Sequence, residues 1–191
     1  MKTKGPYPSP PTKEEIERER LRPVFPPSPR FRGKNPDSKW THLPLLTRYV
    51  AITQGPVLEL GCGVFSTTVL HEMCVGTGRL LVSVEVSPSF YEMFEPLRCP
   101  LHEIVLIKKD EWLEWDGLTS RHWSVVLVDQ VPDTSRAPCI EKLKGHARYI
   151  VAHNSEQPYY RYEPVFRRFR YRRDYTFLRP CTTVVSDEVP V

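Results

Sequence analysis

Five short runs rich in Val, Ile and Leu recur along the chain, and each has the length of one β-strand. The runs are PVLEL (56–60), RLLVSVEV (79–86), EIVLIKK (103–109), SVVLVD (124–129) and ARYIVAH (147–153). Segments of helical composition lie between them, namely STTVLHEMC (66–74), SPSFYEMFEPL (87–97) and APCIEKLKG (137–145). Continuous apolar runs are typical of strands covered on both faces. Their alternation with helices predicts an α/β fold with a doubly wound, mostly parallel sheet.

Two further segments flank this alternating region. TRYVAITQG (47–55), preceded by several large apolar residues, reads as an amphipathic helix that Gly55 ends. The stretch RRDYTFLRPCTTVVSD (172–187) holds two β-prone runs separated by Arg179 and Pro180. It predicts an antiparallel hairpin at the C-terminal end of the sheet.

The beginning of the chain has a different composition. Nine of the 20 prolines lie at or before Pro36, and each removes a backbone donor and favours extended structure in the preceding residue. We therefore expect residues 1–38 to form a Pro-rich, largely flexible arm and residues 39–191 to form one domain. Thr12 and Glu15 have the spacing of a capping box, so one short helix inside the arm is an alternative.

Composition excludes several classes of protein. Hydrophobic residues make up 40% and charged residues 26%, which is typical of a globular chain. No apolar run approaches the ~20 residues of a membrane span, and the first residues lack the apolar core of a signal peptide. The five cysteines are odd in number and lack zinc-ligand spacing, which disfavours a disulfide framework or a structural zinc. We expect a soluble, cytoplasmic protein.

The net charge of +4 is unevenly distributed. Residues 1–36 and residues 157–180 each carry +5, so the remainder carries −6. The segment YYRYEPVFRRFRYRRDY (159–175) interleaves arginines with aromatic residues, a combination that binds phosphates and stacks on bases in single-strand binders. Alternation of Phe169 and Tyr171 with Arg168, Arg170 and Arg172 also describes a strand with one buried face, which we favour. Nucleic acid stays open as a partner, as do a protein and an acidic small molecule.

A glycine turn, ELGCG, ends the first predicted strand, and the acid Glu85 ends the second, 24 residues after Gly61. In open α/β sheets, ligands bind outside the carboxyl ends of the strands, and an acid at this place accepts hydrogen bonds from a ribose. The turn lacks the third glycine of a dinucleotide fingerprint, since Ser66 stands there, which disfavours a nicotinamide-dependent oxidoreductase. Glu59, two residues before Gly61, would oppose a phosphate and attract a cationic group. These residues predict an adenosine-containing ligand with a cationic end.

Over roughly residues 41–187 the sequence resembles the class I S-adenosylmethionine-dependent methyltransferases, which have a Rossmann-like fold. The resemblance rests on VLELGCG, VEVS, KKDEW and VVLVDQVP at the first four strands and on the closing hairpin. It implies that S-adenosyl-L-methionine is the cofactor. The cofactor-binding residues that it implies are Glu59, Gly61, Cys62 and Gly63 at the methionine part, Glu85 at the ribose, Val86 at the adenine, Asp110 with Glu111 or Trp112 beside the base, and Asp129. The departure is Phe65, which stands where the family often has its third glycine.

Methyl transfer is an in-line displacement that needs an aligned acceptor and help with loss of its proton. The catalytic candidates follow the fourth and fifth predicted strands: Asp129, His153, Asn154 and Glu156. His153 is the natural general base, with Asp129 to orient it, although a histidine here can also cap the strand. The arrangement is similar to the magnesium site of the catechol O-methyltransferase type, but His153 replaces an aspartate. Imidazole suits zinc, iron or manganese better than magnesium, and we expect no metal.

The sequence thus predicts a methyltransferase that acts on an oxygen or nitrogen of an unidentified acceptor, most simply a small molecule. The alternative is a non-catalytic methyltransferase-like module. In that interpretation the basic arm and the Arg/Tyr-rich segment 159–175 bind a protein or nucleic acid.

Overall fold

The computed structural model describes residues 38–191. The predicted arm, apart from its last residue, and the short helix around Thr12 lie outside the described residues. In the described part of the chain, no helix is long and apolar enough to cross a membrane.

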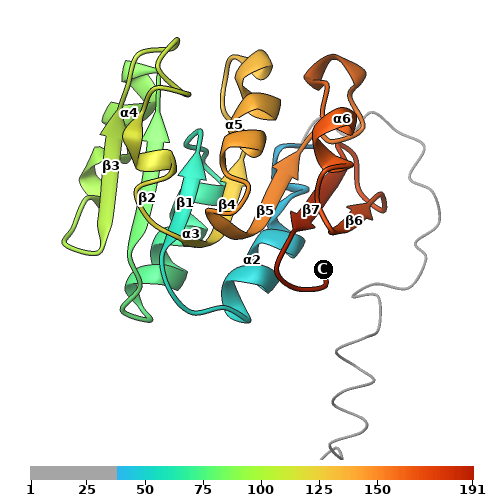
Figure 1. Cartoon of the computed structure of the whole chain (residues 1–191). Helices are drawn as coiled ribbons and strands as arrows, with labels where there is room; N and C mark the ends of the chain where they lie inside the picture. The colour runs from blue at the N-terminus through green and yellow to red at the C-terminus, as the bar shows by residue number, and fades with distance from the viewer. Residues whose placement is uncertain (1–37) are drawn as a thin grey trace, which may run out of the picture. The chain divides into compact units, whose positions relative to one another are not determined.

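One seven-stranded sheet forms the centre of the domain (Figure 1). The strands follow one another in space in the order β3-β2-β1-β4-β5-β7-β6, and the first five are mutually parallel. Their bounds are β1 Val57–Leu60, β2 Leu81–Glu85, β3 His102–Leu106, β4 Trp123–Val128, β5 Ala147–His153, β6 Tyr171–Tyr175 and β7 Thr182–Ser186. The predicted Rossmann-like, doubly wound sheet is confirmed. Each of the five apolar runs overlaps one strand, with ends that differ by up to three residues.

The helices have the bounds α2 Leu43–Ala51, α3 Ser66–Val75, α4 Pro88–Phe94, α5 Arg136–Lys142 and α6 Glu163–Phe166. Short 3₁₀ turns are η1 Ser38–Trp40, η2 Glu95–Leu97, η3 Asp116–Leu118, η4 Asp133–Ser135 and η5 Pro158–Tyr160. The prediction of a helix over 47–55 is wrong at both ends. Pro44 lies in the first turn of α2, where its fixed φ and missing N–H are tolerated, so the helix begins earlier. Gly55, with φ +96°, turns the chain into β1 instead of capping the helix.

Helices cover both faces of the sheet (Figure 1). One face packs against α2 and α3 through residues such as Leu46, Leu70 and Leu127, and the other packs against α5 and α6. Side chains alternate along a strand, so most odd-numbered residues of β1, β2, β4 and β5 share the face under α2 and α3. The exceptions are Trp123 and Ala147, the first residues of β4 and β5, which belong to the core on the other face. At the carboxyl ends, this face carries the polar residues Glu59, Ser83, Glu85, Asp129 and His153.

The C-terminal hairpin is confirmed, because β7 pairs antiparallel with both β5 and β6. The favoured strand around residues 168–172 is present as β6, but it begins only at Tyr171, and the preceding part of the segment 159–175 forms η5 and α6 instead. Pro158 and Pro164 lie in the first turns of η5 and α6, and proline cannot donate in a ladder. The predicted alternation nevertheless holds next to β6: Phe169 is buried, and Arg168, Arg170 and Arg172 are exposed.

Candidate functional site

The turn after β1 approaches the end of β4 so closely that only glycine fits at position 61. Gly61 has φ +89°, and a Cβ atom there would lie 2.7 Å from the Cα atom of Gln130 and 2.9 Å from the carbonyl oxygen of Asp129. A Cβ atom on Gly63 would meet only the hydroxyl of Ser66, at 3.2 Å. The first glycine therefore holds the turn against the sheet.

Glu85, at the end of β2, is tied to the same turn. Its Oε2 atom accepts a 2.8 Å hydrogen bond from the backbone N–H of Cys62. Its Oε1 atom accepts hydrogen bonds from the N–H groups of Val86 and Ser87, at 2.7 and 2.8 Å. A carboxylate offers about four acceptor positions, so these three bonds leave one for a ligand hydroxyl. The structure brings Gly61, Cys62, Glu85 and Val86 into one cluster.

Glu59 lies behind the turn and is fully buried. Its Oε2 atom accepts a hydrogen bond from the Ser83 hydroxyl, while Oε1 has no partner among the described residues. Burial raises the pKa of Glu59 to about 7, although the nearby hydroxyls of Ser66 and Ser83 act in the opposite direction. Burial and the two neighbouring carboxyls raise the pKa of the Cys62 thiol, which therefore stays protonated.

The residues predicted to flank the base lie after β3 in different surroundings. Asp110 is exposed, and Glu111 pairs with Lys108 at 2.8 Å. Trp112 is 1% exposed, belongs to the core on the α5 side and donates from Nε1 to the carbonyl oxygen of Val131. Within residues 38–191, no hydrogen bond or ion pair joins these residues to the glycine turn.

Asp129 and His153 face one another at the ends of β4 and β5. Oδ2 of Asp129 lies 3.1 Å from Nδ1 of His153, and Oδ1 lies 3.0 Å from Nη1 of Arg136. Burial disfavours the Asp129 carboxylate, but the hydrogen bond with His153 and the charges of His153 and Arg136 outweigh it and hold its pKa below the ordinary value. This contact is the one through which Asp129 would orient His153, a role that stays a prediction.

The second nitrogen of His153 is also engaged. Nε2 lies 2.9 Å from the hydroxyl of Thr41, which donates a 2.7 Å hydrogen bond to the carbonyl oxygen of Pro180. Thr41 precedes α2, and Pro180 lies in the turn of the C-terminal hairpin. His153 is thus held between two distant segments of the chain.

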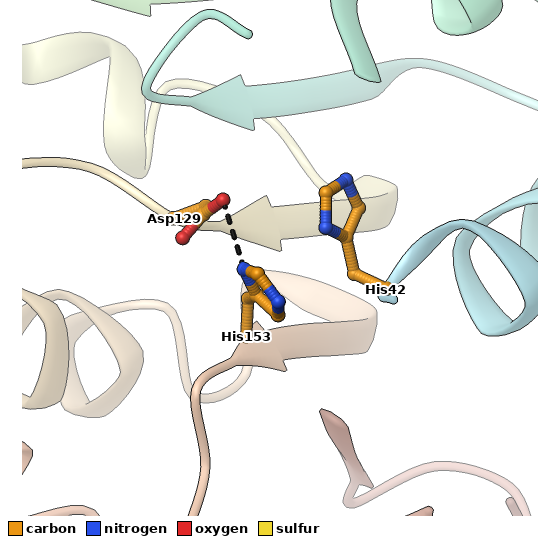
Figure 2. Close-up of side chains that lie close together, drawn as sticks. All are labelled: His42, Asp129 and His153. Carbon is orange, nitrogen blue, oxygen red and sulfur yellow. Dashed lines mark hydrogen bonds and ion pairs between the residues drawn. The ribbon is translucent and has the colours of Figure 1, made fainter. Parts of the chain in front are cut away.

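His42, at the N-terminus of α2, completes the group (Figure 2). Its ring lies edge-on to that of His153 with centroids 4.6 Å apart, and the residue is 2% exposed. Burial and the nearby His153 lower the pKa of His42 to about 4, so the ring is neutral at neutral pH. The sequence analysis gave no role to His42 or to Arg136, because no local pattern distinguishes either residue.

Asn154 and Glu156, the other catalytic candidates, follow β5. Asn154 has φ +57° and accepts a hydrogen bond from Arg136 at 3.3 Å. Oε2 of Glu156 accepts a hydrogen bond from the N–H of Cys181, which anchors the hairpin. Next to them is a hollow of about 500 Å³, the size of a small-molecule site. It is lined by Ser155, Glu156, Gln157, Pro158, Arg161, Tyr162, Glu163 and Pro164.

Comparison of the sequence with protein-family models and with curated proteins finds no match. Comparison of the structure finds methyltransferases. The chain superposes on the methyltransferase domain of METTL16 with a TM-score of 0.57 at 10% identity, over 78% of this chain and 67% of that one. For the human methyltransferase 10 domain containing protein the TM-score is 0.52 at 9% identity, over 78% and 83% of the two chains.

WbdD, a bifunctional kinase-methyltransferase, gives a TM-score of 0.52 at 14% identity. The likeness covers 76% of this chain, which spans only 39% of the WbdD chain. At these identities the likeness concerns the fold alone. The sheet order, the glycine turn and the closing hairpin, taken with these neighbours, show that residues 38–191 have the fold of the class I methyltransferases.

Proposed function

We propose that this protein is an S-adenosyl-L-methionine-dependent methyltransferase. The observation that carries the proposal is the hydrogen bond between Glu85 and the N–H of Cys62, at 2.8 Å. It holds an acid beside a glycine turn at the carboxyl ends of adjacent parallel strands, where open α/β sheets bind nucleosides. The acceptor position left on Glu85 suits a ribose hydroxyl.

The buried Glu59 favours this cofactor over a dinucleotide. Its Oε1 atom has no hydrogen-bond partner in residues 38–191, and a carboxyl group behind the turn disfavours a pyrophosphate. S-adenosyl-L-methionine carries an ammonium group and a sulfonium, which supplies the methyl group. Gly61, Cys62 and Gly63 would lie along its methionine part, Val86 against its adenine, and Asp110, Glu111 and Trp112 beyond the base.

The acceptor would bind on the side of β4 and β5. Asp129, His153, Asn154 and Glu156 follow these two strands, and we assign them to the acceptor's orientation and to the loss of its proton. Of the pair Asp129 and His153, Asp129 is the member that a ligand reaches, because its side chain is 25% exposed whereas that of His153 is 5% exposed.

A small-molecule acceptor would suit the hollow of about 500 Å³ that Glu156 helps to line, next to but not lined by Asp129, His153 and Asn154. The Arg/Tyr-rich segment offers a weaker case for nucleic acid. Tyr160, Tyr162, Phe166 and Phe169 are buried in the core instead of being available for stacking. METTL16 has been crystallised with an RNA hairpin. The experiment must therefore distinguish an RNA acceptor from a small-molecule acceptor.

Calorimetric titration with S-adenosyl-L-methionine and S-adenosylhomocysteine tests the cofactor, with NAD as the control ligand. We expect micromolar binding of the two sulfur ligands and none of NAD. Glu85→Gln should weaken binding by roughly ten- to a hundredfold, as expected for a hydrogen bond to a charged group. Glu92→Gln, an exposed carboxyl on α4, is the matched control and should bind like the wild type.

Transfer of a labelled methyl group to separate metabolite, RNA and protein fractions then tests catalysis. Labelling confined to the metabolite fraction is expected. Labelling of RNA would overturn the choice of acceptor but keep the enzyme. Cofactor binding without transfer to any fraction would favour the non-catalytic module, and failure of both sulfur ligands to bind at millimolar concentration would refute the proposed function.

A further inference from the structure

His42, Asp129 and His153 extend toward one another from α2, from the residue after β4 and from β5 (Figure 2). Each offers one nitrogen or oxygen atom, and these three atoms lie within 4.8 Å of one another. Among the described residues this is the only group of three potential ligand side chains that lie so close. Two imidazoles and one carboxylate form a donor set that binds first-row transition metals.

The hydrogen bonds of Thr41 determine which nitrogen of His153 carries a proton. The hydroxyl of Thr41 donates its one hydrogen to the carbonyl oxygen of Pro180, so it can only accept from Nε2 of His153. In a neutral ring the proton therefore lies on Nε2, and Nδ1 presents a lone pair. That lone pair faces Oδ2 of Asp129, which also only accepts, across 3.1 Å. Two acceptors in contact need a cation between them, which is either a second proton on the ring, giving the hydrogen bond described above, or a metal ion.

His42 provides an independent indication. Both of its ring nitrogens are buried and have no hydrogen-bond partner in the described part of the chain. A polar group that is buried without a partner costs roughly 1–3 kcal/mol, so such groups are rare unless something else binds them. The neutral ring has one unprotonated nitrogen, which is the form that ligates a metal.

We propose that His42, Asp129 and His153 bind a divalent transition metal ion, for which Zn²⁺ is the experimental probe. The proposal concerns metal binding alone and does not rest on methyl transfer. It differs from the magnesium-type arrangement considered for the sequence, because the third ligand is a histidine from α2 instead of Asn154.

The distances fit such an ion after a small adjustment. Donors about 2.1 Å from one ion lie roughly 3.0 Å apart at a right angle and 3.4 Å apart in a tetrahedron. Asp129 and His153 already meet this spacing at 3.1 Å. The donor atoms lie within 4.8 Å of one another, so His42 has to approach by up to about 1.4 Å for a tetrahedral ion. Rotation of a side chain whose nitrogens have no hydrogen-bond partner among the described residues provides this movement.

The partners of His153 and Asp129 are of the kind that orient metal ligands in other proteins. A ligating histidine usually donates its second N–H to a fixed acceptor, as Nε2 of His153 does to Thr41. A ligating carboxylate usually has a partner on its other oxygen, and Oδ1 of Asp129 forms an ion pair with Nη1 of Arg136 at 3.0 Å. Magnesium prefers oxygen ligands and retained waters, so we expect selection against it.

Titration of the metal-stripped full-length protein with Zn²⁺ is the test. We expect one ion per chain and no binding of Mg²⁺. His42→Leu should weaken Zn²⁺ binding by at least about a hundredfold, since loss of an outer partner alone costs ten- to a hundredfold. His146→Gln is the matched control, because His146 precedes the opposite end of β5, and it should bind Zn²⁺ like the wild type. Co²⁺ absorption bands should appear in the wild type and be lost in His42→Leu.

Stability measurements show whether a variant has merely unfolded. In chelator, His42→Leu should unfold at the same temperature as the wild type or higher, because it removes unpaired buried nitrogens. Zn²⁺ should raise the unfolding temperature of the wild type but not of this variant. Thr41→Val should weaken Zn²⁺ binding by ten- to a hundredfold, and Thr41→Ser should restore it.

Two results would overturn the proposal. One is the absence of Zn²⁺ and Co²⁺ binding to the wild type, which would make Asp129 and His153 a carboxylate–imidazolium pair. The other is unchanged Zn²⁺ affinity in His42→Leu, which would place the ion elsewhere. Failure of S-adenosyl-L-methionine to bind would refute the proposed function and leave the metal proposal standing.

Discussion

The Ser83 hydroxyl donates a 2.7 Å hydrogen bond to the buried carboxyl group of Glu59 on the neighbouring strand. Ser83 in turn lies 3.0 Å from Nε2 of His102, and Nδ1 of His102 lies 2.9 Å from Nδ1 of His71 on α3. A continuous chain of hydrogen bonds thus leads from a half-buried helix residue to Glu59. This chain fixes the carboxyl group without supplying a positive charge, so burial keeps its pKa high.

Stability should therefore depend on pH through Glu59. Its pKa is about 7 in the folded protein against an ordinary value of 4.5, so the folded state binds more protons between these values. The contribution of Glu59 to the free energy of unfolding should fall as pH rises through this range, by up to about 3 kcal/mol, and level off above it. His42 and His102, whose pKa values burial lowers to about 4, contribute with the opposite sign, so the Glu59 part is the difference between the wild type and Glu59→Gln. Glu59→Gln should lack this component. Urea unfolding of both proteins at pH 5 and pH 8 measures it, and an equal loss in both would contradict the assignment.

Gly61→Ala should destabilise the fold strongly. A Cβ atom would meet the backbone of Gln130 at 2.7 Å, and the positive φ adds strain. We expect a loss of about 3 kcal/mol or more in chemical denaturation. Gly63→Ala meets only a side-chain hydroxyl at 3.2 Å and should cost less than about 1 kcal/mol. Similar losses in both variants would show that the turn does not press on β4.

Arg136 should contribute far more to stability than the exposed arginines. It is 4% exposed and pairs with Asp129, so its loss leaves a partly buried carboxylate uncompensated. Arg136→Met should cost about 3 kcal/mol. Arg168→Met, which removes an exposed ion pair with Glu141, should cost less than about 1 kcal/mol. Thermal unfolding of the two variants side by side tests this ranking.

The variant Asp110→Asn tests cofactor binding without an effect on folding, at a position predicted to flank the base. Asp110 is exposed, so the change should leave the unfolding temperature unaltered. If Asp110 contacts the cofactor, the affinity for S-adenosyl-L-methionine should fall roughly tenfold. Lys109→Gln, next to it and also exposed, serves as the control. Equal affinity in Asp110→Asn would remove this residue from the site.

The sequence was sufficient for the sheet because the strand signal is local. Runs such as 147–153 are largely apolar, since helices cover both faces of the sheet, and no distant residue is needed to recognise them. Gly61 and Glu85 were found for the same reason, as each follows or ends such a run. Two details differ from the prediction. The helix α2 begins earlier than expected, with Pro44 in its first turn, and the segment before β6 forms two short helices that begin at or next to Pro158 and Pro164.

The residues of the site that the sequence did not predict are those that only tertiary packing brings together. His42 is an ordinary histidine in sequence, and it becomes notable only because α2 places it beside His153 and deprives it of water. Arg136 likewise gains its role when α5 turns it toward Asp129. Trp112 differs from these two residues because it was predicted to lie beside the base. It is close to Asp110 in sequence, but in the structure it is enclosed in the hydrophobic core.

Thr41 bonds to residues 112 and 139 positions away in sequence, His153 and Pro180. Contacts between such distant positions form late in folding, because closing long loops costs chain entropy before the contact repays it. The histidine cluster should therefore be the last part of the domain to assemble. During refolding, recovery of Co²⁺ absorption should trail recovery of far-ultraviolet circular dichroism, which makes the cluster a built-in reporter of completed folding.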